Sequence, residues 1–221
     1  AGIEANQKLL NAIADNAHQL FEAYWPQGPL QAAFDDQPTA LDMDKVGGTL
    51  RQIVRDWSAD GAAEREPVYA RVRHLLQTLY PAKGQQQQQQ PGQPPLSFSS
   101  CKGRANVRVL LPGAGLSRLS VELAAMGFAS QGNEFSYHML IAGAFLMNCV
   151  ERPAEFEIRP FCEQTINSRS RADQFKPVAV PDETTYDMMD RAEDFGGEFG
   201  ELSMIAGDFI EVYTKPDQVG A

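Results

Sequence analysis

The sequence has few cysteines, and they form no recognisable pattern. Cys101, Cys149 and Cys162 are the only three, and none lies at the spacing of a CxxC or CxxH zinc site. An odd number of widely spaced cysteines is typical of free thiols in a reducing compartment rather than of a disulfide framework. The sequence also lacks an Asn-x-Ser/Thr acceptor for N-glycosylation. We therefore expect an intracellular protein without a metal site.

A long apolar run and a basic N-terminus are also missing. No segment approaches the roughly 20 consecutive apolar residues that a transmembrane helix needs. The first residues are amphipathic and carry an acid at Glu4, unlike a signal peptide with a basic start and an apolar core. We therefore expect no association with a membrane.

Basic residues are outnumbered by acidic ones. Lys and Arg total 19 against 29 Asp and Glu, which gives a formal net charge of −10. The densest basic run, Arg169, Arg171 and Lys176, is too sparse to form a phosphate-binding face, so we expect no nucleic-acid partner. Of the 221 residues 43% are hydrophobic, and Gly (18) and Pro (14) are too few for wholesale disorder. The chain can therefore form one or two folded domains.

Residues 1–80 have the pattern of a helical region. A second helix is expected to begin after Asp42, whose carboxylate can cap its first turn, and a third helix to run from about Ala62 to Leu79. The first helix carries one apolar stripe at three- and four-residue steps, formed by Leu9, Leu10, Ile13, Ala17, Leu20 and Phe21.

A change of composition separates this region from the rest of the chain. Residues 81–106 contain six consecutive glutamines, at positions 85–90, together with several prolines and serines. Such a segment buries too little apolar surface to offset the entropy lost on ordering it. We therefore predict a flexible insert over residues 81–106.

From residue 107 to residue 221 the pattern alternates between strand and helix. Strands are predicted at Val107–Leu111, Phe128–Gln131 and Leu202–Ala206, and helices at Leu116–Gly127 and Phe135–Cys149. Strands that alternate with helices predict an α/β fold with a parallel sheet.

A glycine loop follows the first of these strands. Gly113 and Gly115 allow a tight turn and let the backbone approach a ligand, and the following helix adds free amides at its N-terminus. Glu134, about 20 residues further on at the end of the second strand, can accept hydrogen bonds from both hydroxyls of a ribose. This arrangement predicts a site for a nucleotide-containing cofactor, against the alternative of a glycine turn with an unrelated surface glutamate.

Two classes of cofactor fit this layout. A dinucleotide site usually has a third glycine where this chain has Arg118, because the helix must lie close to the pyrophosphate. S-adenosylmethionine has no pyrophosphate, and Asp208 and Phe209, after the third strand, suit its adenine, although Asp208 can equally cap the helix that follows. Methyl transfer is favoured, and an NAD-dependent oxidoreductase and a non-catalytic Rossmann-like binding module remain as alternatives.

Several longer motifs closely resemble the carnosine N-methyltransferase family. They lie between about residue 1 and residue 213, and the glutamine-rich insert interrupts them. The chain departs from the family at Ser117, where the family commonly has glycine. The motifs are Ile53–Ser58 with Ala63–Arg65, Pro112–Leu116, Gln131–Ser136, Arg171–Gln174 followed by Pro177 and Pro181-Asp182, and Ala206–Phe209.

The resemblance implies a Rossmann-like class I methyltransferase sheet preceded by a helical region. It implies methylation of an imidazole nitrogen of carnosine or a related histidyl dipeptide, with S-adenosylmethionine as the methyl donor. In the family a glutamine and an arginine of the helical region hold the donor, and they correspond to Gln52 and Arg55, which are three residues apart and share a helix face. The predicted donor-binding set is therefore Gln52, Arg55, Gly113, Gly115, Glu134, Asp208 and Phe209.

The family's chain continues well past the point that corresponds to residue 221. We therefore expect this chain to contain the donor-binding half of the domain and to lack the acceptor half, so that it binds the donor weakly and shows no detectable turnover. No catalytic residue is assigned. We expect a cytoplasmic location, with the nucleus as a second compartment. The sequence leaves open whether the protein forms a homo-oligomer.

Overall fold

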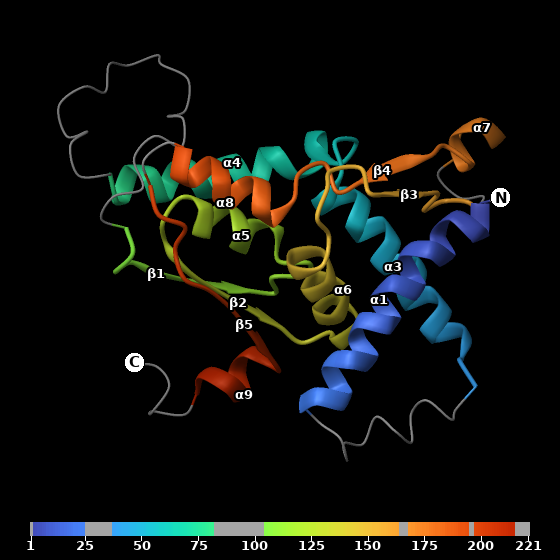
Figure 1. Cartoon of the computed structure of the whole chain (residues 1–221), viewed down its shortest axis with the longest axis horizontal. Coiled ribbons are helices and arrows are strands. Elements are labelled where there is room, and N and C mark those ends of the chain that lie inside the picture. Colours follow the sequence, from blue (N-terminus) through green and yellow to red (C-terminus); the bar gives the residue numbers. More distant parts are fainter. Residues whose placement is uncertain (1, 25–36, 82–103, 164–167, 195–196, 215–221) are drawn as a thin grey trace.

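The chain is a mixed α/β structure in which helices surround a small parallel sheet (Figure 1). The computed structural model describes residues 2–24, 37–81, 104–163, 168–194 and 197–214. In chain order the elements are α1 (Gly2–Tyr24), α3 (Ala40–Trp57), α4 (Ala62–Leu79), β1 (Arg108–Pro112), α5 (Arg118–Ala125), β2 (Ala129–Glu134), α6 (Tyr137–Asn148), β3 (Phe156–Ile158), α7 (Arg171–Gln174), β4 (Val178–Val180), α8 (Thr185–Asp194), β5 (Leu202–Ala206) and α9 (Phe209–Tyr213).

The main sheet has the strand order β1-β2-β5, and its strands are parallel, as predicted. Pro112 pairs with Asn133, and Glu134 pairs with Ala206, so the carboxyl ends of the strands meet at one edge of the sheet. In Figure 1, α3 and α6 lie beyond the end of β2. Ligands of open parallel sheets bind outside this edge, so we expect a binding site at the loops that follow the strands.

The predicted helices of the first region are present, but the second one begins differently. Thr39 is the N-cap of α3: its hydroxyl accepts the amide of Asp42 (3.3 Å), and the Asp42 carboxylate accepts the amide of Thr39 (3.1 Å). The prediction that Asp42 is itself the cap was wrong, because Asp42 is the third helical residue of a capping box. The apolar stripe of α1 is confirmed at Leu9, Ile13 and Ala17, which are buried.

One hydrophobic core joins these helices to the sheet. Leu9, Ile53 and Trp57 from α1 and α3 are fully buried in the same cluster as Leu116 and Leu146, which flank the sheet. Most of the predicted insert, residues 82–103, lies outside the described residues. The division of the chain at residues 81–106 therefore stays a prediction.

The sequence predicts none of the elements between residues 150 and 200. β3 and β4 form an antiparallel pair in which Phe156 lies opposite Val180, and α8 packs against α5. Three-residue strands are too short to show the alternation that identifies a strand. The strand predicted at Phe128–Gln131 continues to Glu134. Gly132 and Asn133 have low strand propensity, so the sequence pattern stops before them, but both residues pair with the two neighbouring strands.

Candidate functional site

The loop between β1 and α5 has left-handed backbone at alternate residues. The φ angle is +65° at Gly113, +56° at Gly115 and +64° at Ser117. The amide of Ala114 donates to the carbonyl of Asn133 (3.0 Å), which ties the loop to β2. A Cβ at Gly113 would meet no described atom within 4 Å. The glycines therefore form the predicted tight turn, and the backbone at Gly113 is open to a ligand.

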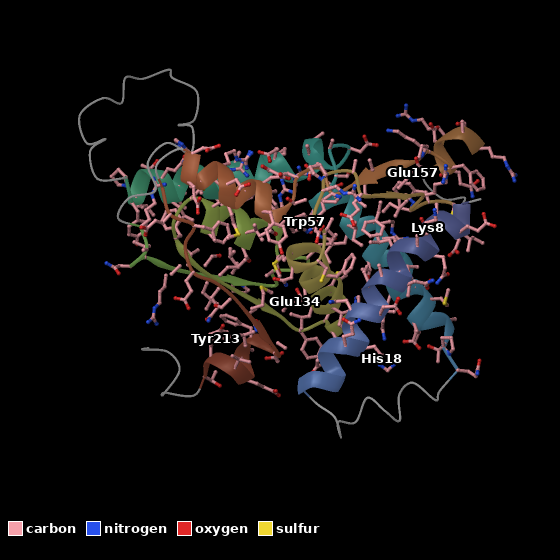
Figure 2. All side chains as sticks on the ribbon, in the orientation of Figure 1. Lys8, His18, Trp57, Glu134, Glu157 and Tyr213 are labelled. Atoms are coloured by element: carbon pink, nitrogen blue, oxygen red, sulfur yellow. The ribbon has the colours of Figure 1, made fainter. Side chains whose placement is uncertain are left out.

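Glu134, the last residue of β2, is held by two backbone amides. The amide of Gly115 donates to its Oε2 (2.7 Å), and the amide of Ser136 donates to its Oε1 (2.8 Å). Glu134 is only 9% exposed, and Figure 2 places it at the end of β2 near the middle of the molecule. Each carboxylate oxygen can accept a further hydrogen bond. The carboxylate therefore offers two acceptors at a fixed position, which is what recognition of adjacent hydroxyl groups requires.

α3 brings Gln52 to the glycine loop and places Arg55 three residues further along the same helix. The Nε2 atom of Gln52 lies 3.8 Å from the position that a Cβ on Gly115 would take. The side chain of Arg55 is 35% exposed, and its Nε lies 3.8 Å from Asp56 Oδ1 and 3.6 Å from Glu64 Oε1. Both distances exceed those of good hydrogen bonds, so the guanidinium group can still bind an anion in a bidentate manner.

Asp208 and Phe209 follow β5, next to the end of β2. The amide of Gly207 donates to the carbonyl of Glu134 (3.0 Å), which fixes the backbone just before Asp208. Asp208 is the N-cap of α9, because its Oδ1 accepts the amides of Ile210 (2.8 Å) and Glu211 (3.2 Å). Both of these bonds use Oδ1, so the cap leaves Oδ2 for another donor. Phe209 is 40% exposed, and its ring packs on Tyr213, with 5.1 Å between the ring centroids.

The structure thus brings the predicted residues to one edge of the sheet. Contacts lead from Gln52 to Gly115, from Gly115 to Glu134, and from Glu134 to the residue before Asp208. Arg55 joins this group through its neighbour Asp56. Phe209 follows Asp208 directly, at the exposed start of α9.

Asp56 is a residue of this site that the sequence analysis did not single out. It is 2% exposed, its Oδ2 accepts the Nε2 amide of Gln52 (2.7 Å), and its Oδ1 accepts the hydroxyl of Tyr69 from α4 (3.2 Å). Burial raises the pKa of Asp56, and the hydrogen bond from Gln52 opposes that rise. The spacing could have revealed Asp56, because it lies four residues after Gln52 and so on the same helix face.

Arg118, which occupies the place of a third glycine, binds other side chains of the protein. Its guanidinium is buried, forms ion pairs with Glu122 (2.9 Å) and Asp182 (2.8 Å), and lies over the ring of Trp57, with 5.1 Å from Cζ to the centroid. Trp57 in turn donates its Nε1 hydrogen to the carbonyl of Leu116 (3.1 Å). Arg118 therefore supports the loop through Trp57, and its charge is paired within the protein.

Other candidate features lie elsewhere. A cavity of about 500 Å³ between α6 and β5 is lined mainly by apolar side chains such as Leu140, Ile141 and Met204, and by none of the predicted donor-binding residues. Burial raises the pKa of the Cys149 and Cys162 thiols, which is the opposite of the shift that activates a cysteine nucleophile. Within the described ranges, no group of three or more His, Cys, Asp or Glu residues could hold a metal, and no helix has the length and apolarity to cross a bilayer.

Known proteins similar to this chain share one description. A family model described as carnosine N-methyltransferase matches residues 32–92 and 96–220. A carnosine N-methyltransferase from Schizosaccharomyces pombe is 36% identical over 211 residues, which cover 96% of this chain and 49% of the relative. Those from Dictyostelium discoideum and Rattus norvegicus are 36% and 32% identical over 182 and 217 residues, covering 79% and 96% of this chain and 35% and 47% of the relatives. The chain spans about half the length, or less, of these curated relatives.

Proposed function

The chain belongs to the carnosine N-methyltransferase family, and from this we propose that it binds S-adenosylmethionine at the carboxyl edge of β2. The reaction that we propose for the protein is methylation of an imidazole nitrogen of carnosine or a related histidyl dipeptide. The donor, when bound, supplies a methyl group on a positively charged sulfur. The finer fold that we propose is the Rossmann-like class I methyltransferase sheet, with which the parallel order β1-β2-β5 is compatible.

One observation carries the proposal: the Glu134 carboxylate is fixed by the amides of Gly115 and Ser136 beside the open backbone of Gly113. The residues present fit the chemical groups of the donor. Glu134 suits the two ribose hydroxyls, Arg55 suits a carboxylate, and Oδ2 of Asp208 suits the exocyclic amine of adenine.

The described residues bind and orient the donor in this proposal. Contacts at Glu134 and at Arg55 would hold it at two separated points, which restricts its orientation and so lowers the entropic barrier to transfer. The acceptor imidazole must present a neutral nitrogen, and we assign no described residue to that task. An NAD-dependent oxidoreductase is not favoured, because the relatives are methyltransferases and Arg118 is buried among its ion-pair partners.

The surroundings that we propose for the protein follow from its composition. A net charge of −10 favours a small acceptor over a nucleic acid. The three widely spaced cysteines favour the cytoplasm, with the nucleus as a second compartment.

Calorimetric titration of the 221-residue chain with S-adenosylmethionine, and separately with NAD, tests the donor site. We expect saturable binding of S-adenosylmethionine that Glu134→Ala weakens about tenfold, or about 1.4 kcal/mol. The matched control is Glu201→Ala, because Glu201 is exposed just before β5 and its change should leave the affinity unaltered. Absence of binding by a folded chain, or an equal loss in both variants, would overturn the proposed site.

A further inference from the structure

The carboxylate of Asp56 connects both residues of α3 that the proposed function assigns to the donor. Its Oδ2 accepts the Nε2 amide of Gln52 at 2.7 Å, and its Oδ1 lies 3.8 Å from Nε of Arg55. The hydroxyl of Tyr69, on α4, donates to the same Oδ1 at 3.2 Å. Asp56 is 2% exposed, so these neighbours hold it in place with little help from water.

The chemistry of an ionised carboxylate determines which end of the Gln52 amide faces it. A carboxylate only accepts hydrogen bonds, so the amino group of Gln52 is directed to Asp56 and its carbonyl oxygen, Oε1, is the end left for another partner. One helical turn away, Arg55 carries donors that its long contacts with Asp56 and Glu64 do not satisfy. The α3 surface therefore presents an acceptor and a cation side by side.

We infer that Asp56, supported by Tyr69, is a positioning residue that makes Gln52 and Arg55 complementary to the α-amino acid end of the donor. This inference rests on the proposed function. Oε1 of Gln52 accepts the ammonium group, and the guanidinium of Arg55 binds the carboxylate. The negative charge of Asp56 also lies beside the loop, with Oδ2 4.0 Å from the position of a Cβ on Gly115, where it attracts the ammonium group.

Two ligands that share an adenosine and a neutral sulfur separate this role from a merely structural one. S-adenosylhomocysteine has the amino acid end, and 5′-methylthioadenosine lacks it. Asp56→Asn preserves size but offers Gln52 a donor as well as an acceptor, which allows the Gln52 amide to turn around. We expect calorimetry of the full chain to show an affinity for S-adenosylhomocysteine about tenfold lower in Asp56→Asn, with the affinity for 5′-methylthioadenosine within about twofold of wild type.

Tyr69→Phe keeps the test decisive where Asp56→Asn does not fold. It removes one hydroxyl, and we expect about a threefold loss for S-adenosylhomocysteine alone. Tyr186→Phe is the matched control, because the Tyr186 hydroxyl is exposed and donates to the carbonyl of Asn148 (3.0 Å), away from this edge. Equal losses for both ligands, or no loss for either, would overturn the positioning role and leave the donor site standing. A wild-type chain that binds neither ligand would overturn the proposed function itself.

Discussion

Two groups of charged residues lie on either side of the glycine loop, and they differ in how completely their charges are paired. Behind the loop, Arg118 forms ion pairs with Glu122 and Asp182, which themselves pair with Arg73 and Arg65. We call these five residues the buried ion network. Arg65, Arg118 and Glu122 are each no more than 5% exposed. The buried ion network uses its charges within the protein, so its role is to join α4, α5 and the turn before α8.

The opposite side of the loop leaves hydrogen-bonding capacity unused. Glu134 accepts one backbone amide at each oxygen, and Arg55 has only long contacts to its carboxylates. Charge density alone would favour the buried ion network as the binding site. The candidate site is therefore identified by charged groups whose hydrogen-bonding capacity the protein leaves unused.

The largest effect is expected from breaking the buried ion network. Arg118→Ala leaves the buried Glu122 and the half-buried Asp182 with one cation each, and it removes the contact with the Trp57 ring. We expect the free energy of unfolding, measured by urea denaturation, to fall by about 3 kcal/mol, because a buried pair that loses one partner is strongly destabilised.

Lys176→Ala is the matched control for that loss. Lys176 pairs with Asp60 (2.6 Å), but its side chain is 61% exposed. An exposed pair of this kind contributes at most about 1 kcal/mol. Comparable losses in the two variants would mean that burial does not distinguish the network from the surface.

A smaller effect is expected at the contact between the network and the loop. Trp57→Phe keeps a ring for Arg118 but removes the donor to the buried carbonyl of Leu116. An unsatisfied buried carbonyl and the lost volume should lower the free energy of unfolding by about 2 kcal/mol. We also expect a weaker affinity for S-adenosylmethionine, since Leu116 lies within the glycine loop, between Gly115 and Ser117. Stability lost without any change in affinity would show that the two sides of the loop act independently.

The sequence predicts the unsatisfied side of the loop better than the paired side. Gly113, Gly115 and Glu134 lie within about 20 residues of one another, and a strand–loop–helix pattern has a recognisable spacing. The strand predicted at Leu202–Ala206 is confirmed, and it too has a local signal: a short, mainly apolar run that ends at Gly207. Local patterns of this kind predict backbone conformation. The edge of the sheet is predictable because it consists mainly of strand ends and the glycine loop.

The buried ion network could not be predicted in this way. Arg65 and Asp182 are 117 residues apart, and Arg118 and Asp182 are 64 apart. Nothing in a local window says that these charges meet, and charged residues in helices are ordinarily solvated. The short strands β3 and β4, which bring Asp182 towards Trp57, escape prediction for the same reason, because tertiary contacts rather than local propensity stabilise them.

The smallest effect is expected at Ser117, which is the last residue of the glycine loop and directly precedes Arg118 of the buried ion network. It ends the glycine loop in left-handed backbone and contacts Met204, with 3.1 Å from Oγ to Sδ. Ser117→Gly removes a steric cost of about 1 kcal/mol and loses one weak contact, so we expect stability to rise by about 0.5 kcal/mol. Ala154→Gly is the matched control, because Ala154 is exposed, has a φ of +57° and lies outside the glycine loop. Equal gains with unchanged donor affinity would mean that Ser117 stores only local strain. A gain accompanied by altered affinity for S-adenosylmethionine would mean that this strain sets the shape of the donor site.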